Sequence, residues 1–394
     1  MLGKRQFSLR KLFLAVTLIG VGLGLTVTAC TTFERYYGDQ RRAILAVERL
    51  GGKVGFGFRG RGILTTGNAR SVTLSVDPGI AMRFDEIAAN LRAMPRLEEL
   101  TLHGAAVTDG TLEQLYGLQA LHRLYLKSTS DTGQGFVHLG DSARLSRVGV
   151  WQSPVSDAGI ARLARFPNLD SLSLHGTKVQ GQGLGHFSDL TRLRSLSLTP
   201  VRSPQEPLAA LPQLTQVSHL ELSGAVGDEA LSNIARMPAL DLLWLSQAPI
   251  TDQGLAHLAR SRTLRWLSLS GTSITGSGFE HFSNCVSLKY LDLPGTQVDD
   301  EAVAHIARIE SLERLNLNDT LVTDRGINAL ERMPHLEYLQ IQNTATTDQC
   351  VTCLQNLPRL LYIEIQGTEI TESGSTRLRE SRSLEWLNHH NIRW

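Results

Sequence analysis

The sequence predicts an α/β solenoid in which each coil contributes one strand and one short helix. The first observation is an apolar pattern, L-x-x-L-x-L, that returns every 24 residues from Leu97 to Leu360, with one step of 23. The second is the other half of each unit, where an acidic residue precedes apolar residues three apart. A fixed period of this length is typical of chains that grow in one dimension by stacking similar units.

The N-terminal segment predicts attachment to a membrane. Residues 1–11 are basic, and the 22 residues 12–33 carry no charge. As a helix they would extend about 33 Å, enough to cross a hydrocarbon core of about 30 Å. The positive-inside tendency leaves the chain after residue 33 outside the cytoplasm. We therefore expect a protein of the cell membrane, single-pass or lipid-anchored, whose repeats face the periplasm or the extracellular side.

Three versions of this segment remain open. Residues 12–33 can form an uncleaved transmembrane signal anchor, which is the version we favour. The stretch Val27-Thr28-Ala29-Cys30 resembles a bacterial lipobox, which makes Cys30 a candidate for lipidation after cleavage. A basic region followed by an apolar one is also typical of a signal peptide for simple secretion. All three versions place the repeats on the same side of the membrane.

Residues 34–70 are expected to form an N-terminal cap. Ile44, Val47 and Leu50 fall on one face of a predicted helix, and Gly51-Gly52 ends it. The glycine-rich stretch that follows predicts a strand and a turn that lead into the first repeat.

The repeat domain is predicted to cover residues 71–394, with about 12 repeats and a truncated last strand at Leu384–Leu387. Within a unit, positions 1, 4 and 6 are apolar and alternate with polar residues, which predicts a strand with one buried face. Position 9 is threonine in seven repeats, and its hydroxyl is expected to bond the backbone of the turn and of the neighbouring coil. The acidic residue at position 13 is predicted to be the N-cap of the short helix.

Residues 97–394 resemble a leucine-rich repeat protein, which implies a horseshoe with a parallel concave sheet and short convex helices. The stretch Thr320-Leu-Val-Thr-Asp-Arg-Gly-Ile327 is similar to 24-residue bacterial repeats related to the cysteine-containing class. Two N-terminal stretches resemble membrane-anchored repeat proteins of planctomycete bacteria: Phe7-Ser-Leu-Arg-Lys-Leu and Ala46-Val-Glu-Arg-Leu-Gly-Gly-Lys-Val54. These resemblances imply an interaction role. Eukaryotic relatives can serve ubiquitin ligases through an F-box, but residues 34–70 are too short and glycine-rich for one.

Nothing in the sequence indicates catalytic chemistry. The formal net charge of +1 gives no electrostatic footprint for nucleic acid. Cys350-Val-Thr-Cys353 is a C-x-x-C motif, but it falls within an ordinary repeat helix, where we expect both thiols to pack in the core. No second C-x-x-C completes a zinc site. We therefore expect no enzyme activity, no cofactor, no bound metal and a monomeric repeat domain.

Position 3 of each strand points away from the buried leucines onto the concave surface. In the C-terminal half this position is aromatic in five coils and arginine in one, although only 6% of the chain is aromatic. Tryptophan, tyrosine and arginine are enriched at binding hot spots. The candidate partner-binding residues are these six and one neighbour at position 5: Trp244, Trp266, Tyr290, Arg314, Tyr338, Tyr362 and Trp386.

We therefore predict a membrane-tethered extracytoplasmic module that binds a protein partner on its concave face. A polar and acidic rim would favour a partner with basic or polar groups. The expected rim residues are Asp292, Glu313, Asn316, Glu337, Gln340 and Glu364. The alternative interpretation of this column is that the rings only stack on one another and stabilise the sheet. The alternative function is a structural or adhesive protein of the cell envelope, with an enzyme or a ubiquitin-ligase-type substrate receptor less favoured.

Overall fold

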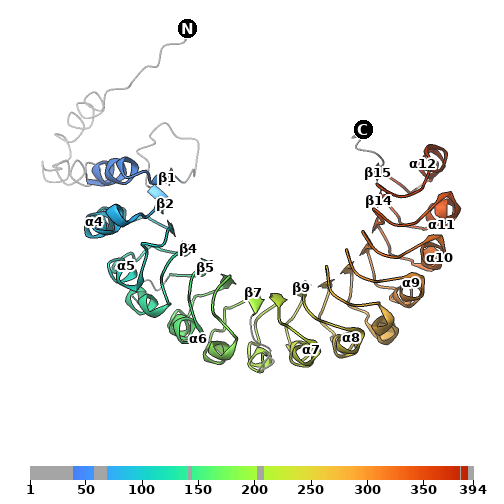
Figure 1. Ribbon diagram of the computed structural model, residues 1–394, viewed down its shortest axis with the longest axis horizontal. Coiled ribbons are helices and arrows are strands. Elements are labelled where there is room, and N and C mark those ends of the chain that lie inside the picture. Colours follow the sequence, from blue (N-terminus) through green and yellow to red (C-terminus); the bar gives the residue numbers. More distant parts are fainter. Residues whose placement is uncertain (1–38, 57–68, 141–143, 202–207, 382, 389–394) are drawn as a thin grey trace, which may run out of the picture.

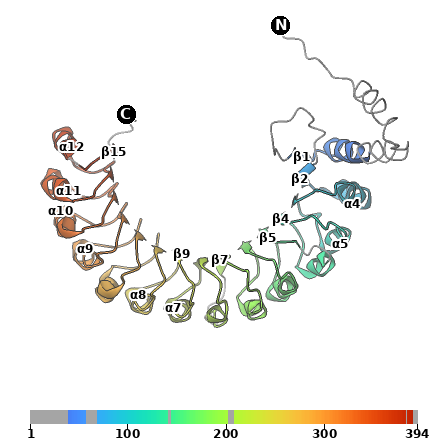
Figure 2. The ribbon, with the colours of Figure 1, turned by 180° about the vertical axis from the view of Figure 1, so that it is seen from behind.

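The chain forms a horseshoe of stacked coils. The structure, a computed structural model, describes residues 39–56, 69–140, 144–201, 208–381 and 383–388. The strands line the inner, concave side of the arc and the helices its outer, convex side, as two opposite views show (Figures 1 and 2). The predicted α/β solenoid with a concave sheet and convex helices is confirmed.

Within the described residues, fifteen strands form one sheet whose order follows the chain from β1 to β15. Strands β2 to β15 are parallel, as predicted, but β1 pairs antiparallel with β2. The strands are β1 Lys53–Phe56, β2 Ala69–Ser75, β3 Glu99–His103, β4 Arg123–Lys127, β5 Arg147–Trp151, β6 Ser171–His175, β7 Ser195–Val201, β8 His219–Gly224, β9 Leu242–Ser246, β10 Trp266–Ser268, β11 Tyr290–Asp292, β12 Arg314–Asn316, β13 Tyr338–Gln340, β14 Tyr362–Glu364 and β15 Trp386–Asn388.

The convex side contains both α-helices and tighter 3-10 helices. The α-helices are α3 Pro78–Ala81, α4 Phe84–Arg92, α5 Asp109–Glu113, α6 Asp157–Ile160, α7 Asp228–Ile234, α8 Asp252–Leu258, α9 Asp300–Ile306, α10 Asp324–Ala329, α11 Val351–Asn356 and α12 Glu372–Arg379. The 3-10 helices are η1 Gln134–Leu139, η2 Ala161–Arg165, η3 Gln182–Phe187, η4 Leu211–Gln213, η5 Ser277–Asn284, η6 Leu330–Arg332 and η7 Asp348–Cys350. Residues 39–49, before β1, are also helical and overlap the predicted cap helix.

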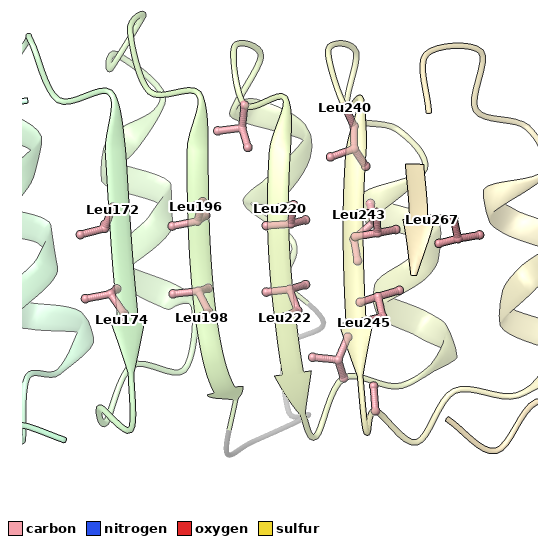
Figure 3. Packing of buried hydrophobic residues seen from close by; sticks show 14 of the residues in the cluster. Leu172, Leu174, Leu196, Leu198, Leu220, Leu222, Leu240, Leu243, Leu245 and Leu267 are labelled. Carbon is pink, nitrogen blue, oxygen red and sulfur yellow. The ribbon is translucent and has the colours of Figure 1, made fainter. Parts of the chain in front are cut away.

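The core lies between the sheet and the helices. Leu220, Leu243 and Leu267 are fully buried, and Figure 3 shows the leucines of neighbouring strands in rows across the sheet. Leu243 and Leu267 are register partners, so each coil covers the apolar residues of the next. Burying one such side chain contributes about 1.5–3 kcal/mol. No single coil can bury its own apolar face, so stability depends on the stack.

The acidic residue at position 13 does not cap its own helix, and in this the sequence-based prediction was wrong. The N-cap of α8 is Thr251, and Asp252 is the first helical residue. The Asp252 carboxylate instead accepts backbone N–H groups of the following coil, from Thr275 at 3.1 Å, Gly276 at 2.8 Å and Gly278 at 3.1 Å. Because Asp252 lies one residue inside the helix, its side chain points along the solenoid toward the next coil rather than back onto its own first turn.

We call this contact the cross-coil staple. The described residues show it for Asp109, Asp157, Asp228, Asp252, Asp300, Asp324 and Asp348. Most of the stapled coils carry a glycine at position 15, beneath the carboxylate. A Cβ atom added at Gly326 would lie 2.5 Å from Asp300 Oδ1, which leaves no room for a side chain. The cross-coil staple therefore explains both the aspartate and the glycine of the repeated Thr-Asp-x-Gly pattern.

The threonine hydroxyls at position 9 mostly bond within their own coil. Thr272 Oγ1 donates to the carbonyl of Leu269 at 2.7 Å, and this bond recurs at Thr296, Thr320, Thr344 and Thr368. The Thr129 hydroxyl reaches the next coil instead, where it donates to Ser153 Oγ at 2.8 Å. The predicted bond to the backbone of the turn is therefore confirmed in five coils. Among the described residues, the bond to a neighbouring coil reaches a side chain and not the backbone that was predicted.

The predicted membrane segment, residues 12–33, and the candidate lipidation site Cys30 lie outside the described residues. In the part of the chain that the structure describes, no helix is both long enough and apolar enough to cross a bilayer.

Candidate partner-binding face

Six of the candidate residues occupy one register on six neighbouring strands. Along the parallel ladder, successive Cα partners are Trp266, Tyr290, Arg314, Tyr338, Tyr362 and Trp386. Trp244 lies on β9 opposite Ser268, two positions further along the strand. We call these seven residues the aromatic column. Position 4, next to each column residue, carries a buried leucine or isoleucine, so the pleat turns the column toward the concave surface.

The first three rings of the column are in contact. The indoles of Trp244 and Trp266 meet edge to face, with ring centroids 6.4 Å apart. Trp266 and Tyr290 are tilted by 32° at 4.9 Å. Aromatic pairs at these distances contribute about 0.5–1.5 kcal/mol beyond the area that they bury.

The guanidinium of Arg314 continues the stack between two tyrosines. Its carbon lies 5.3 Å from the ring centroid of Tyr290 and 3.9 Å from that of Tyr338. Tyr338 and Tyr362 follow with parallel rings 4.5 Å apart, and Trp386 closes the column 6.1 Å from Tyr362. The faces of the central rings are thus occupied by neighbours within the column.

The column is also accessible. Trp244 and Trp386, at its two ends, expose 39% and 37% of their surface. The hydroxyls of Tyr290, Tyr338 and Tyr362 have no hydrogen-bond partner among the described residues. Stacking therefore satisfies the ring faces and leaves ring edges and hydroxyl groups available to a ligand.

The concave surface is hollowed along the column. A groove of about 370 Å³ is lined by the six aligned column residues and by four of the predicted rim residues. Those four are Asp292, Asn316, Gln340 and Glu364. The other two predicted rim residues, Glu313 and Glu337, lie just before their strands, at position 2 on the opposite side of the column.

Asp292 is held in place by the column itself. The indole Nε1–H of Trp266 donates to Asp292 Oδ2 at 2.8 Å. Burial raises the pKa of Asp292 above its usual value, while the hydrogen bond from Trp266 and the charge of Arg314 oppose that shift. Burial of the carboxyl is therefore only partly compensated by its neighbours.

Side-chain amides form a second row beside the column, which we call the amide ladder. Asn318 Nδ2 donates to Gln342 Oε1 at 3.1 Å, and Gln342 Nε2 donates to Gln366 Oε1 at 3.0 Å. Gln366 Nε2 then donates to Asn388 Oδ1 at 2.9 Å. The column thus has the amide ladder on one side and the carboxylates of position 2 on the other.

The concave surface of the N-terminal half carries a second aromatic cluster that the sequence analysis missed. Trp151 and His175 stack within 5° of parallel at 6.2 Å, and Tyr125 tilts against Trp151 at 5.5 Å. Lys127 Nζ lies 5.2 Å from the Trp151 ring centroid. A Cβ atom at Gly149 would lie 2.2 Å from the indole, so this glycine makes room for it. These residues occupy positions 5 and 7, whereas the prediction followed position 3.

The C-x-x-C thiols are packing groups, as predicted. Cys350 and Cys353 are buried, and each Sγ lies 3.2 Å from a backbone carbonyl, that of Thr347 or Ile327. Burial raises the pKa of Cys353 to about 12, and it also raises the pKa of Cys350. Only a thiolate is a good nucleophile or metal ligand. Among the described residues, no group of three or more His, Cys, Asp or Glu is placed to hold a metal ion.

Asp131 is a fully buried carboxyl at position 11, where most coils have valine or isoleucine. Burial and the nearby Asp109 carboxylate raise the pKa of Asp131 to about 8. Burial alone would also raise the pKa of Asp109, but the neighbouring Asp131 carboxyl and hydrogen bonds from Gly135 and Thr132 lower it to about 2. At neutral pH, Asp131 therefore keeps its proton, and neither of its oxygens has a hydrogen-bond partner among the described residues.

Two solved structures share this architecture. An internalin from Listeria monocytogenes is 18% identical, with a TM-score of 0.54 over 82% of this chain and 87% of that protein. A leucine-rich repeat protein from Leptospira interrogans is 20% identical, with a TM-score of 0.54 over 77% and 74%. No protein-family model and no curated protein matches the sequence. The 24-residue period, the parallel concave sheet and these likenesses together show that the chain is, in its fold, a leucine-rich repeat protein.

Proposed function

We propose that this protein is a membrane-tethered, extracytoplasmic module that binds a protein partner through the aromatic column. The observation that carries the proposal is the column itself: seven side chains in contact on seven adjacent strands of a hollowed surface. Tryptophan, tyrosine and arginine dominate binding hot spots because they bury much surface at low entropic cost. A contiguous exposed apolar strip of this kind is typical of an interaction site.

The binding test is a pair of matched double variants. Tyr338→Ala with Tyr362→Ala removes the parallel ring pair, whereas Ser171→Ala with Ser195→Ala changes register partners in the N-terminal half. Partners would be recorded by photo-crosslinking from an unnatural amino acid placed at Asn316 in each background. We expect the main crosslinked partner to be lost from the tyrosine variant alone, with unchanged far-UV circular dichroism. Equal crosslinking in both variants would leave the column as a packing feature.

The tethering part of the proposal is supported by the basic residues 1–11 and the uncharged residues 12–33. Externally added protease should digest the repeats in intact spheroplasts, and shielded repeats would contradict the proposed orientation. Incorporation of labelled palmitate that disappears in Cys30→Ala would select the lipid anchor over the transmembrane anchor.

A further inference from the structure

We propose that the segment seated on the aromatic column is an extended peptide carrying lysine or arginine side chains. This inference rests on the proposed function and gives the chemistry of the partner. It is carried by three features of the groove: its net charge, the orientation of its rings and the difference between its two sides.

The concave face is acidic where the column lies. The described strands β11–β15, together with the residue before each strand, carry five carboxylates and two cations. The carboxylates are Asp292, Glu313, Glu337, Glu364 and Glu385, and the cations are Lys289 and Arg314. Lys289 is already paired with Glu313. At the same positions of β3–β7 there are three carboxylates (Glu98, Glu99 and Asp170) and three cations (Arg123, Arg147 and Arg194), so a basic segment is attracted to the C-terminal half.

The rings favour long basic side chains over flat ligands. Tyr338 has the Arg314 guanidinium on one face and the Tyr362 ring on the other. A sugar ring, which binds by lying on an aromatic face, finds the central faces occupied. Ring edges remain available to the methylene stems of lysine and arginine, which cover apolar surface while their charged ends reach polar groups. The three tyrosine hydroxyl oxygens can accept hydrogen bonds from such charged ends or from peptide N–H groups.

The two sides of the column differ in a way that suits a peptide. On one side Glu337, at position 2, has no ion pair within the described residues. On the other, Glu364 accepts a hydrogen bond from Gln340 Nε2 at 3.0 Å, next to the amide ladder. Amides both donate and accept, as peptide groups do. At about 4.8 Å per coil, the stretch from Tyr290 to Trp386 is roughly 19 Å long, which matches about six residues of extended peptide.

The test uses the full chain in non-ionic detergent, a phage-displayed library of random 12-residue peptides and, in parallel, a panel of neutral oligosaccharides. Enriched peptides should carry at least two lysine or arginine residues. In Glu337→Gln with Glu364→Gln, their affinity should fall about fivefold at low salt, because two charge pairs are lost. The loss should shrink in 0.5 M NaCl, which screens exposed charges. A matched control, Glu113→Gln with Glu380→Gln on the convex side, should bind as the unmodified protein does.

Other results would overturn the inference: enriched peptides without a positive net charge, binding of oligosaccharides alone, no enrichment, or equal affinity in the Glu337/Glu364 variant. Failure of the proposed function has a different signature. Uncharged peptides that depend on Tyr338 and Tyr362 would preserve the aromatic site and remove the charge preference. Basic peptides that depend on Glu337 and Glu364 but tolerate Tyr338→Ala with Tyr362→Ala would preserve the charge preference and remove the aromatic site.

Discussion

Replacing Asp252 by asparagine tests the cross-coil staple at a single pair of coils. The carboxylate accepts three backbone N–H groups, and the Thr275 hydroxyl donates a fourth bond at 2.8 Å. Asparagine retains one acceptor oxygen and turns an NH₂ group toward donors. A hydrogen bond to a charged group contributes about 1.5–3 kcal/mol, and an unsatisfied buried donor costs about 1–3 kcal/mol. Because the bonds share one carboxylate and are not additive, we expect Asp252→Asn to destabilise the fold by about 2–4 kcal/mol at pH 7.

The pH dependence of this loss identifies its cause. Burial raises the pKa of Asp252, but hydrogen bonds from Thr275, Gly278 and Gly276 outweigh it and lower the pKa below 3.8. A group whose pKa is lower in the folded state stabilises above its unfolded pKa, and this contribution is lost as the pH falls through the folded pKa. Asparagine does not titrate. The difference between the two proteins should therefore shrink below about pH 4.

Guanidinium unfolding followed by far-UV circular dichroism and tryptophan fluorescence, at pH 7 and pH 3, measures both effects. Asp319→Asn is the control, because Asp319 is exposed and accepts one hydrogen bond, from Asn343 at 2.8 Å. For this control, the free energy of unfolding should change by less than about 0.5 kcal/mol, as for most surface substitutions. A loss for Asp252→Asn as small as the control, or equal at the two pH values, would refute the reasoning.

Three further substitutions or measurements check other parts of the structure. Leu291 is fully buried, so Leu291→Ala should cost about 2–5 kcal/mol in denaturant unfolding, and a cost near zero would mean that the strand register is wrong. The folded pKa of Asp131, about 8, lies above its unfolded value, so its contribution is lost as the pH rises toward 8. Asp131→Val should therefore raise the melting temperature more at pH 8 than at pH 5, and an equal gain would contradict the buried, protonated carboxyl. Cys353, with a pKa of about 12, should resist iodoacetamide at pH 8 in the native protein and react in guanidinium, whereas rapid native labelling would show an accessible thiolate.

The periodic pattern was sufficient to predict the strands, the buried positions and the register. Because every coil repeats the same apolar pattern, a position that is assigned wrongly in one coil is recognised by comparison with the equivalent positions of the other coils. The staple shows where this reasoning stops. Spacing within a coil indicated that Asp252 lies at a helix start, but it did not indicate that the carboxylate turns toward Thr275 of the next coil.

The part of the candidate site that lies at a single position of the repeat could be predicted from the sequence. Tyr338 and Tyr362 share position 3, and their register pairing is confirmed. Whether such rings stack or splay depends on rotamers, which no sequence pattern contains. The cluster around Trp151 was missed because it spreads over positions 5 and 7 of three strands. A search of all outward positions together, rather than one column at a time, would have found it.

We expect the stack of coils to divide into separate cooperative unfolding units where the cross-coil staple is missing. Glycine replaces the acidic residue at Gly133, Gly181 and Gly276, and a glycine has no carboxylate to reach the next coil. From Asp300 to Asp348 the staples follow without a break. In a nearest-neighbour description, this run should open as a single cooperative unit rather than coil by coil. The central side chains of the groove belong to these coils, so a ligand meets a surface that is already ordered and loses less conformational entropy on binding.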